Sequence, residues 1–174
     1  LEEAFALVNQ TGYGLTSGLE SLDEREQKDW VDHIRAGNLY VNRVTTGAVV
    51  LRQPFGGMGK SVFGPGIKAG GPNYLVQLMD FEDWPTMSIE EPVADPLLAD
   101  LRERLRAGVS GVQGVSDAEA RRVIAAIGSF ARAVREECGR EHDHFRLLGQ
   151  DNIRRYLPVP NLRIRVHPAD GFFD

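Results

Sequence analysis

The sequence has a single cysteine, no long apolar run and no excess of positive charge. One cysteine excludes an internal disulfide and weakly favours a cytoplasmic location. No stretch approaches about 18 uninterrupted apolar residues, so we expect no membrane span. The net charge of −5 gives no electrostatic argument for a nucleic-acid partner, because such partners select clustered Lys and Arg. The first residues, "LEEAFALVNQ", contain no basic-then-apolar leader and no Met, so we expect no signal peptide and a piece of a longer protein.

What is present, 42% hydrophobic and 26% charged residues among 174, is typical of a globular protein. The first part combines two periodicities, which predict an α/β layer. Its expected elements are a helix over 1–9, a strand in "LTSGLES", a helix over 23–36 capped by Asp23, and a strand in "NLYVN". Gly37 stands where a left-handed residue would end the second helix.

The second part is predicted to be mainly helical. A helix begins at Asp95 and Pro96 and ends at Gly108, and a Ser116–Glu119 capping box begins another over 117–138. The stretch "PNYLVQLMDFEDWP" is expected to be a short buried segment. At the end, "NLRIRVH" alternates apolar and polar residues, which predicts a half-buried terminal strand.

Between these parts, residues 43–72 show no period and are rich in glycine. Loops of this length are usually functional or disordered, and the apolar residues here favour an ordered, functional loop. The run Gly59-Lys60-Ser61 suggests a phosphate-binding loop, but that motif needs a glycine at position 54, where Pro54 has no N–H to offer. A nucleotide site is therefore a minor alternative, which saturable ATP binding would support.

Three motifs occur in an order that identifies a family. The stretches "NQTGYGLTSGL", "AGNLYVN" and "QPFGGMGKS" resemble the C-terminal end of the catalytic domain of aldehyde dehydrogenases. Within that superfamily, "TTGAVVLRQPFGG" followed by "KAGGPNYL" resembles the branch that oxidises L-glutamate γ-semialdehyde, the open form of Δ1-pyrroline-5-carboxylate. The tail "LGQDNIRRYLPVPNLRIRVHPADG" looks like the region after the dehydrogenase module in bacterial bifunctional proline-catabolic enzymes, the proline utilization A family.

The resemblance implies a domain organisation. Residues 1–80 would form the C-terminal part of an aldehyde dehydrogenase catalytic domain, including a substrate-anchor loop over 43–60, which we call the anchor loop. Residues 81–155 would be a linker and a two-helix extension, and residues 156–174 the start of a further C-terminal domain. The expected class is α/β followed by a mainly helical extension and a terminal strand.

The resemblance also implies which residues meet the substrate. Gly47 and Ala48 would hold its α-carboxylate through their main-chain N–H groups, and consecutive amides in a turn do form anion-binding concavities. Thr46 would be a weaker candidate through its hydroxyl, and Phe55 would pack on the aliphatic part of the substrate. The alternative is that Gly47 only turns a hairpin and Phe55 is ordinary core. Structural roles are expected for the remaining residues singled out, which are Asn42, Gly56, Gly57, Gly59, Lys60 and Ser61.

The catalytic groups of the family are not found in this sequence. The reaction implied for the parent is NAD-dependent oxidation of the semialdehyde to glutamate, which needs a cysteine nucleophile, a glutamate base and a cofactor domain. Cys138 lies on the apolar face of a helix, outside any nucleophile motif, and is expected to be buried. No cofactor-binding motif is present, and the pair His142 and His144 is too sparse to predict a metal site.

The parent implied by the resemblance is a cytoplasmic homo-oligomer with a small-molecule substrate, and it binds FAD if a proline dehydrogenase module lies upstream. This chain would not be catalytic alone. The alternative from another class is a non-catalytic assembly or lid module, in which the helices at 96–107 and 117–138 dock on a partner subunit. Open apolar stripes on these helices would favour that alternative.

Overall fold

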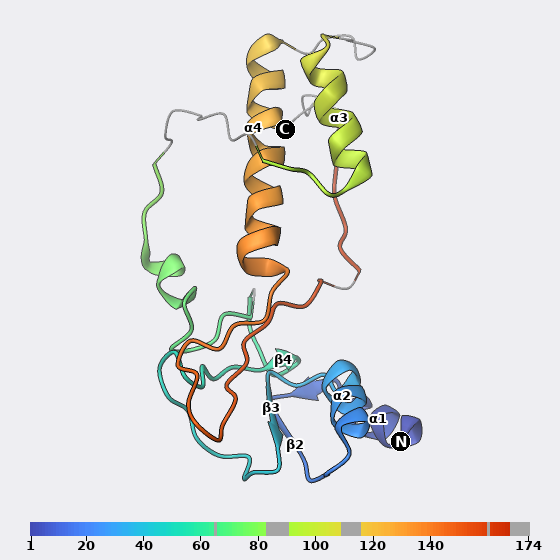
Figure 1. Cartoon of the computed structure of the whole chain (residues 1–174), viewed down its shortest axis with the longest axis vertical. Helices are drawn as coiled ribbons and strands as arrows, with labels where there is room; N and C mark the ends of the chain where they lie inside the picture. Colours follow the sequence, from blue (N-terminus) through green and yellow to red (C-terminus); the bar gives the residue numbers. More distant parts are fainter. Residues whose placement is uncertain (65, 83–90, 109–115, 160, 168–174) are drawn as a thin grey trace. The chain divides into compact units, whose positions relative to one another are not determined.

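The computed structural model describes residues 1–64, 66–82, 91–108, 116–159 and 161–167 (Figure 1). The chain divides into two compact units. Unit 1 comprises Leu1–Phe81 and Asp143–Asn152, and unit 2 comprises Glu82–His142 and Ile153–Asp174. A short segment from late in the sequence therefore belongs to the first unit. The predicted domain boundaries at 80 and 155 remain predictions.

Unit 1 is built on a strand–helix–strand arrangement. Strand β2 (Thr16–Leu19) pairs in parallel with β3 (Asn38–Val41), with Thr16 opposite Asn38 and Leu19 opposite Val41. Helix α2 (Glu24–His33) connects them, as a parallel pair requires a crossover. Helix α1 (Glu2–Asn9) precedes this arrangement. The four elements expected over the first 42 residues are confirmed, with shorter bounds for both helices.

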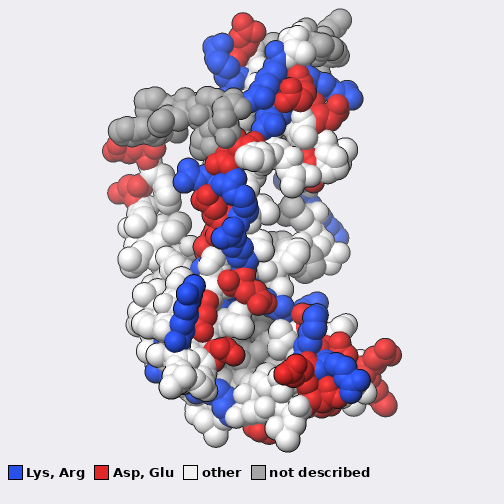
Figure 2. All heavy atoms as spheres, viewed as in Figure 1, with Lys and Arg blue, Asp and Glu red and all other residues white. Residues whose placement is uncertain are grey.

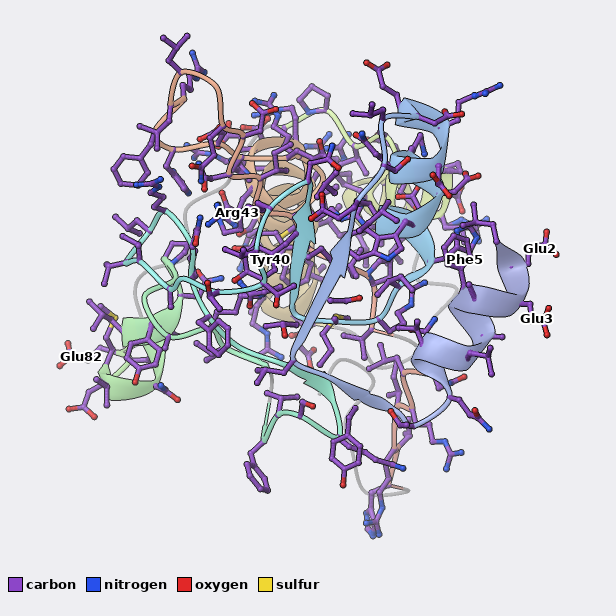
Figure 3. The ribbon with its side chains drawn as sticks, turned by 90° about the horizontal axis from the view of Figure 1, so that it is seen from below. Glu2, Glu3, Phe5, Tyr40, Arg43 and Glu82 are labelled. Atoms are coloured by element: carbon purple, nitrogen blue, oxygen red, sulfur yellow. The ribbon has the colours of Figure 1, made fainter. Side chains whose placement is uncertain are left out.

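The core of unit 1 lies between the helices and this strand pair. Phe5 from α1, Trp30 from α2, and Ile34 are each at most 7% exposed. Leu39 and Val41 of β3 pack against the same cluster, while Tyr40 on the opposite face is 4% exposed. Glu2 and Glu3 project from the outer side of α1 (Figure 3). The apolar positions of the helical pattern therefore anchor β3, whose end begins the anchor loop.

Helix α2 ends earlier than predicted. Asp23 caps its start by accepting a hydrogen bond from the Arg25 N–H at 2.9 Å, as expected. Ile34 is already extended, with φ −74° and ψ 131°, so the helix stops at His33. The expectation that Gly37 would be a left-handed helix end is wrong, because Gly37 is not among the glycines with positive φ.

Gly37 instead permits a close approach of two backbones. A Cβ placed on this residue would lie 1.7 Å from the Gly56 carbonyl oxygen. Any side chain at this position would collide with the glycine-rich loop where it passes the start of β3. The glycine is therefore needed for packing and not for a turn.

The end of the anchor loop is fixed to the first strand of unit 1. Strand β1 (Tyr13–Gly14) pairs antiparallel with β4 (Met58–Gly59). The Lys60 ammonium donates to the Thr11 carbonyl at 3.0 Å, and the Ser61 hydroxyl accepts from the Gly14 N–H at 3.0 Å. These contacts confirm the structural roles expected for Lys60 and Ser61, which stabilise the end of the loop.

Unit 2 is helical. Helix α3 (Pro96–Arg106) packs beside α4 (Asp117–Ala133), which continues into the π-helical turn η2 (Val134–Cys138) (Figure 1). The predicted capping box is present, because Ser116 accepts from the Glu119 N–H while the Glu119 carboxylate accepts from the Ser116 N–H. After η2, His142 and Arg154 form an antiparallel bridge.

Three expectations about burial and strands are wrong. The segment 72–82 carries the short 3-10 helix η1 (Tyr74–Leu78) and is exposed throughout, and Pro85 lies outside the described residues. Residues 161–167 are exposed coil, because no neighbouring described strand offers a ladder to this alternating sequence. Cys138 is exposed, since it lies at the end of η2, well beyond Gly128, the last buried residue of α4.

Charges of both signs share the visible surface. In Figure 2, Lys and Arg side chains lie interspersed with Asp and Glu, and several pairs are ion pairs at helical spacing, such as Lys28 with Asp32 and Arg132 with Glu136. No helix among the described residues has the length and apolar character needed to cross a membrane.

Candidate functional site

The residue between β3 and the anchor loop, Asn42, is held in place by hydrogen bonds. Asn42 has a left-handed backbone, with φ 54°, directly after the last residue of the strand. Its side-chain amide accepts from the Ser21 N–H and donates to the Ser21 carbonyl, both at 2.8 Å. The structural role expected for Asn42 is confirmed, because its side chain joins the ends of the two paired strands at this point.

The turn that contains the predicted carboxylate-binding residues is held in place through the main-chain carbonyl of Gly47. Gly47 has φ 111°, a conformation that favours glycine. Its carbonyl oxygen accepts a hydrogen bond from the Tyr40 hydroxyl at 3.1 Å. Because Tyr40 belongs to β3 and is 4% exposed, the turn is fixed to the strand pair through a buried aromatic side chain.

A positive charge lies beside this turn. The Arg43 guanidinium stands 5.4 Å from the centre of the Tyr40 ring and donates weakly to the Thr46 carbonyl at 3.5 Å. Figure 3 shows Arg43 and Tyr40 side by side. A Cβ on Gly47 would lie 3.7 Å from the nearest Arg43 nitrogen. The arrangement therefore combines main-chain donors with a cation.

The donors of the turn are available. Among the described residues, neither the Gly47 N–H nor the Ala48 N–H donates a hydrogen bond to another group of the chain. Both residues are exposed, as is Thr46. Two consecutive N–H donors in an exposed turn can bind an anion without giving up an existing hydrogen bond.

The loop continues as a small hairpin. Val49 and Gln53 exchange two main-chain hydrogen bonds, of 3.1 and 2.7 Å. The Leu51 N–H at the tip donates to the Gly70 carbonyl at 2.8 Å. These bonds fix the segment 49–53, which follows the turn at 46–48.

Phe55 belongs to a second bridge. Its main chain exchanges hydrogen bonds with Ala69, of 3.0 and 2.9 Å. The Phe55 side chain is half-buried, so it is not an ordinary core residue of unit 1. The hydrogen bonds of Phe55 go to Ala69 and not to the turn at 46–48.

Lys68 joins the glycine-rich loop to the start of β3. Its ammonium donates to the Gly37 carbonyl, to Asn38 Oδ1 at 3.3 Å and to the Gly56 carbonyl at 3.5 Å. Asn38 adds two contacts of its own, donating to the Pro54 carbonyl at 2.9 Å and accepting from the Gly56 N–H at 3.2 Å. Burial lowers the pKa of Lys68 to about 8, so at neutral pH the cation still predominates.

The sequence pattern indicated some of these residues and missed others. It singled out Gly47, Ala48 and Thr46, which the structure brings together in one turn, and Phe55. It missed Tyr40 and Arg43. The available signal for Arg43 was its position, since it directly follows Asn42 and opens the anchor loop.

The described residues show neither a dinucleotide-binding motif nor a cluster of metal ligands. No glycine-rich turn leads from a strand into a helix N-terminus in this part of the chain. Across the described ranges, no group of three or more His, Cys, Asp or Glu could hold a metal ion. His142 instead contacts the Glu137 carbonyl at 2.9 Å.

A sequence profile of the aldehyde dehydrogenase family matches residues 1–83. Residues 1–83 belong to the aldehyde dehydrogenase family. This aldehyde dehydrogenase segment includes β2, β3, the whole anchor loop and Lys68. The expected family assignment is confirmed, and so is the α/β character of this part.

Two named relatives match the aldehyde dehydrogenase segment, one of them over more residues than the segment contains. The bifunctional protein PutA of Rhizobium meliloti is 46% identical over 98 residues, which cover 56% of this chain and 8% of that protein. The 1-pyrroline-5-carboxylate dehydrogenase of a Geobacillus species is 43% identical over 75 residues, covering 43% of this chain and 14% of that protein. The chain therefore spans a small fraction of the length of the relatives it matches.

A solved structure extends the similarity beyond the aldehyde dehydrogenase segment. Proline utilization A from Corynebacterium freiburgense is 37% identical, with a TM-score of 0.73. The match covers 91% of this chain and 15% of that one. Because 91% exceeds the share held by residues 1–83, the helical part also has a counterpart in that protein.

Proposed function

We propose that this chain is part of an NAD-dependent L-glutamate γ-semialdehyde dehydrogenase of the bifunctional proline-catabolic type, and that its anchor loop binds the α-carboxylate of the substrate. The names of the relatives support the reaction, since they include PutA and 1-pyrroline-5-carboxylate dehydrogenase. The role of this chain is to bind and orient substrate. The nucleophile, the base and the NAD site belong, in this proposal, to parts of the parent protein outside the chain.

The observation that carries the proposal is the pair of unused donors at Gly47 and Ala48. Their N–H groups have no acceptor among the described residues, while the Gly47 carbonyl is already satisfied by Tyr40. A carboxylate has two oxygens that accept hydrogen bonds, which suits two adjacent donors. The Arg43 cation beside the turn adds an attraction for the same anion.

Orientation follows from holding one end of the substrate. When the α-carboxylate is bound to a turn that Tyr40 fixes, the carbon chain of the substrate and its aldehyde group can occupy only a limited range of positions. Phe55 contributes an aromatic surface for the methylene groups, and its main chain is fixed by Ala69. A substrate without the carboxylate loses this restriction, so kcat/KM should fall more than the loss of contact area alone predicts.

The carboxylate-anchor role is tested by removing a donor. In the full-length protein, Gly47→Pro eliminates one N–H and forces φ away from its positive value. We expect the KM for glutamate γ-semialdehyde to rise at least about tenfold, while the KM for NAD stays within about twofold. Steady-state kinetics with each substrate varied in turn measure both constants.

A control separates a lost anchor from a damaged fold. Gly64→Ala places a side chain in open space at another positive-φ glycine, so it imposes backbone strain away from the turn. The carboxylate-free aldehyde of equal chain length provides the second readout, because it never used the anchor. Normal semialdehyde binding by Gly47→Pro would show that the anchor is elsewhere. An equal loss with both aldehydes would assign the effect to folding.

A second candidate function is a docking module. Leu97 of α3 and Phe130 of α4 are 80% and 64% exposed, which leaves part of the apolar stripes open, although Ile127 is buried. Such a module would bind a partner subunit without contributing to substrate binding. Leu97→Asp with Phe130→Asp should then change the oligomeric state in light scattering while leaving the KM for semialdehyde unchanged.

A further inference from the structure

Two parts of the sequence that are far apart meet at the anchor loop. Residues Asp143–Asn152 belong to unit 1, although they follow the long helix of unit 2. Arg52, in the hairpin after the Gly47 turn, donates through Nη2 to Gln150 Oε1 at 3.0 Å across 98 residues of sequence. All the side chains at this contact are half-buried, so it is a packed junction and not a surface ion pair.

Gln53 extends this junction to the turn itself. Its side-chain amide has two orientations. In one, Nε2 donates to Asn152 Oδ1 at a long 3.4 Å. In the other, Nε2 donates to the Gly47 carbonyl at 2.8 Å, and Oε1 accepts from Gln150 Nε2 at 3.1 Å and from Arg43 at 2.6 Å. We assign the second, because it satisfies both ends of the amide with three shorter bonds.

The late segment is itself preorganised. The Asp143 carboxylate accepts from the N–H groups of Phe145, Arg146 and Asn152, at 3.1, 2.9 and 3.2 Å. These bonds, that of Arg146 first, hold the pKa of Asp143 below its ordinary value. Gln150 Nε2 also donates to Asn152 Oδ1 at 2.8 Å, which fixes its amide. The segment therefore presents Gln150 in one orientation.

We propose that Gln150 is a positioning residue for the substrate-carboxylate turn. It acts through Gln53, whose side-chain amide donates to the Gly47 carbonyl and leaves the N–H groups of Gly47 and Ala48 unused. The segment 143–152 thus contributes to substrate specificity without touching substrate. This inference depends on the function proposed above for the turn, and it adds a residue that lies outside the aldehyde dehydrogenase segment.

The test uses the full-length protein and the variants Gln150→Ala and Gln150→Glu. Loss of the donor to Gln53 should raise the KM for the semialdehyde about fivefold, with kcat and the KM for NAD within about twofold. Glu at this position still accepts from Arg52 but has no N–H for Gln53, so it should behave like Ala. A Gln150→Glu variant with wild-type KM would overturn the link through Gln53.

The matched control is Asp151→Ala, an exposed neighbour in the same segment. Hydrogen exchange of residues 46–53 supplies a readout that needs no substrate, and it should accelerate in Gln150→Ala but not in Asp151→Ala. Unchanged exchange together with unchanged KM in Gln150→Ala would overturn the positioning role. If exchange accelerates but even wild-type protein does not oxidise the semialdehyde, the positioning role stands and the proposed function fails. A fall in kcat and in melting temperature, together with a rise in the KM for both substrates, would indicate a merely structural contact and overturn the proposal.

Discussion

Gly37→Ala tests how the glycine-rich loop is held against β3. The added Cβ would lie 1.7 Å from the Gly56 carbonyl oxygen, about half the separation that a carbon and an oxygen tolerate. The loop must therefore move away by roughly 1.5 Å, which breaks contacts that depend on this approach. Those contacts are the bonds of Asn38 to Pro54 and Gly56, and that of Lys68 to Gly37.

Three such hydrogen bonds contribute about 1 kcal/mol each, so local opening of the loop should become about 3 kcal/mol easier. In hydrogen exchange of the full-length protein, this predicts roughly hundredfold faster exchange of the Gly56 amide, which donates to Asn38. Gly64→Ala is the comparison, because its Cβ meets nothing within 4 Å. If Gly37→Ala exchanges at the wild-type rate, the close approach does not exist in solution and the packing role of Gly37 is wrong.

Three further outcomes are expected. Burial depresses the pKa of Lys68 from 10.5 to about 8, so between these two pH values the unfolded chain binds more protons than the folded chain. The free energy of unfolding should therefore rise with pH over this window. Urea titrations of Lys68→Met should not show this rise. Arg43→Ala should raise the KM for the semialdehyde about threefold, and the difference from wild type should shrink in kinetics at high salt. Ser116→Ala should lower the stability of α4 by about 1 kcal/mol, seen as faster exchange of its first turn, whereas the exposed neighbour substitution Asp117→Ala should cost less.

The sequence predicted α1, β2, α2 and β3 of unit 1 and both helices of unit 2, because local signals are consistent in these elements. The Asp23 and Ser116 caps, the β2 and β3 patterns and the helical stripes each specify short-range structure, whereas β1 and β4 were not predicted. The predicted strand at 161–167 failed because alternation requires a neighbouring strand, which the described residues do not supply. The prediction that Cys138 is buried was wrong, because the helix continues as η2 well past the buried residues of α4.

The site was predictable only in part. The motif resemblance identified the turn at 46–48, but no periodicity relates Tyr40 to Gly47, and none relates Arg52 to Gln150 across 98 residues. Such contacts depend on tertiary folding, which brings segment 143–152 into unit 1. The sequence analysis did not single out Lys68, which donates to the main-chain carbonyls of Gly37 and Gly56.

Binding of the substrate carboxylate by the anchor loop can be observed directly in a crystal structure of the full-length protein with glutamate, the product of the proposed reaction, bound at the dehydrogenase site. We predict that the α-carboxylate oxygens lie about 2.8–3.2 Å from the main-chain nitrogens of Gly47 and Ala48, with the side chain of glutamate passing Phe55. A carboxylate bound by other groups, with both of these N–H groups facing solvent, would contradict the proposed role of the loop.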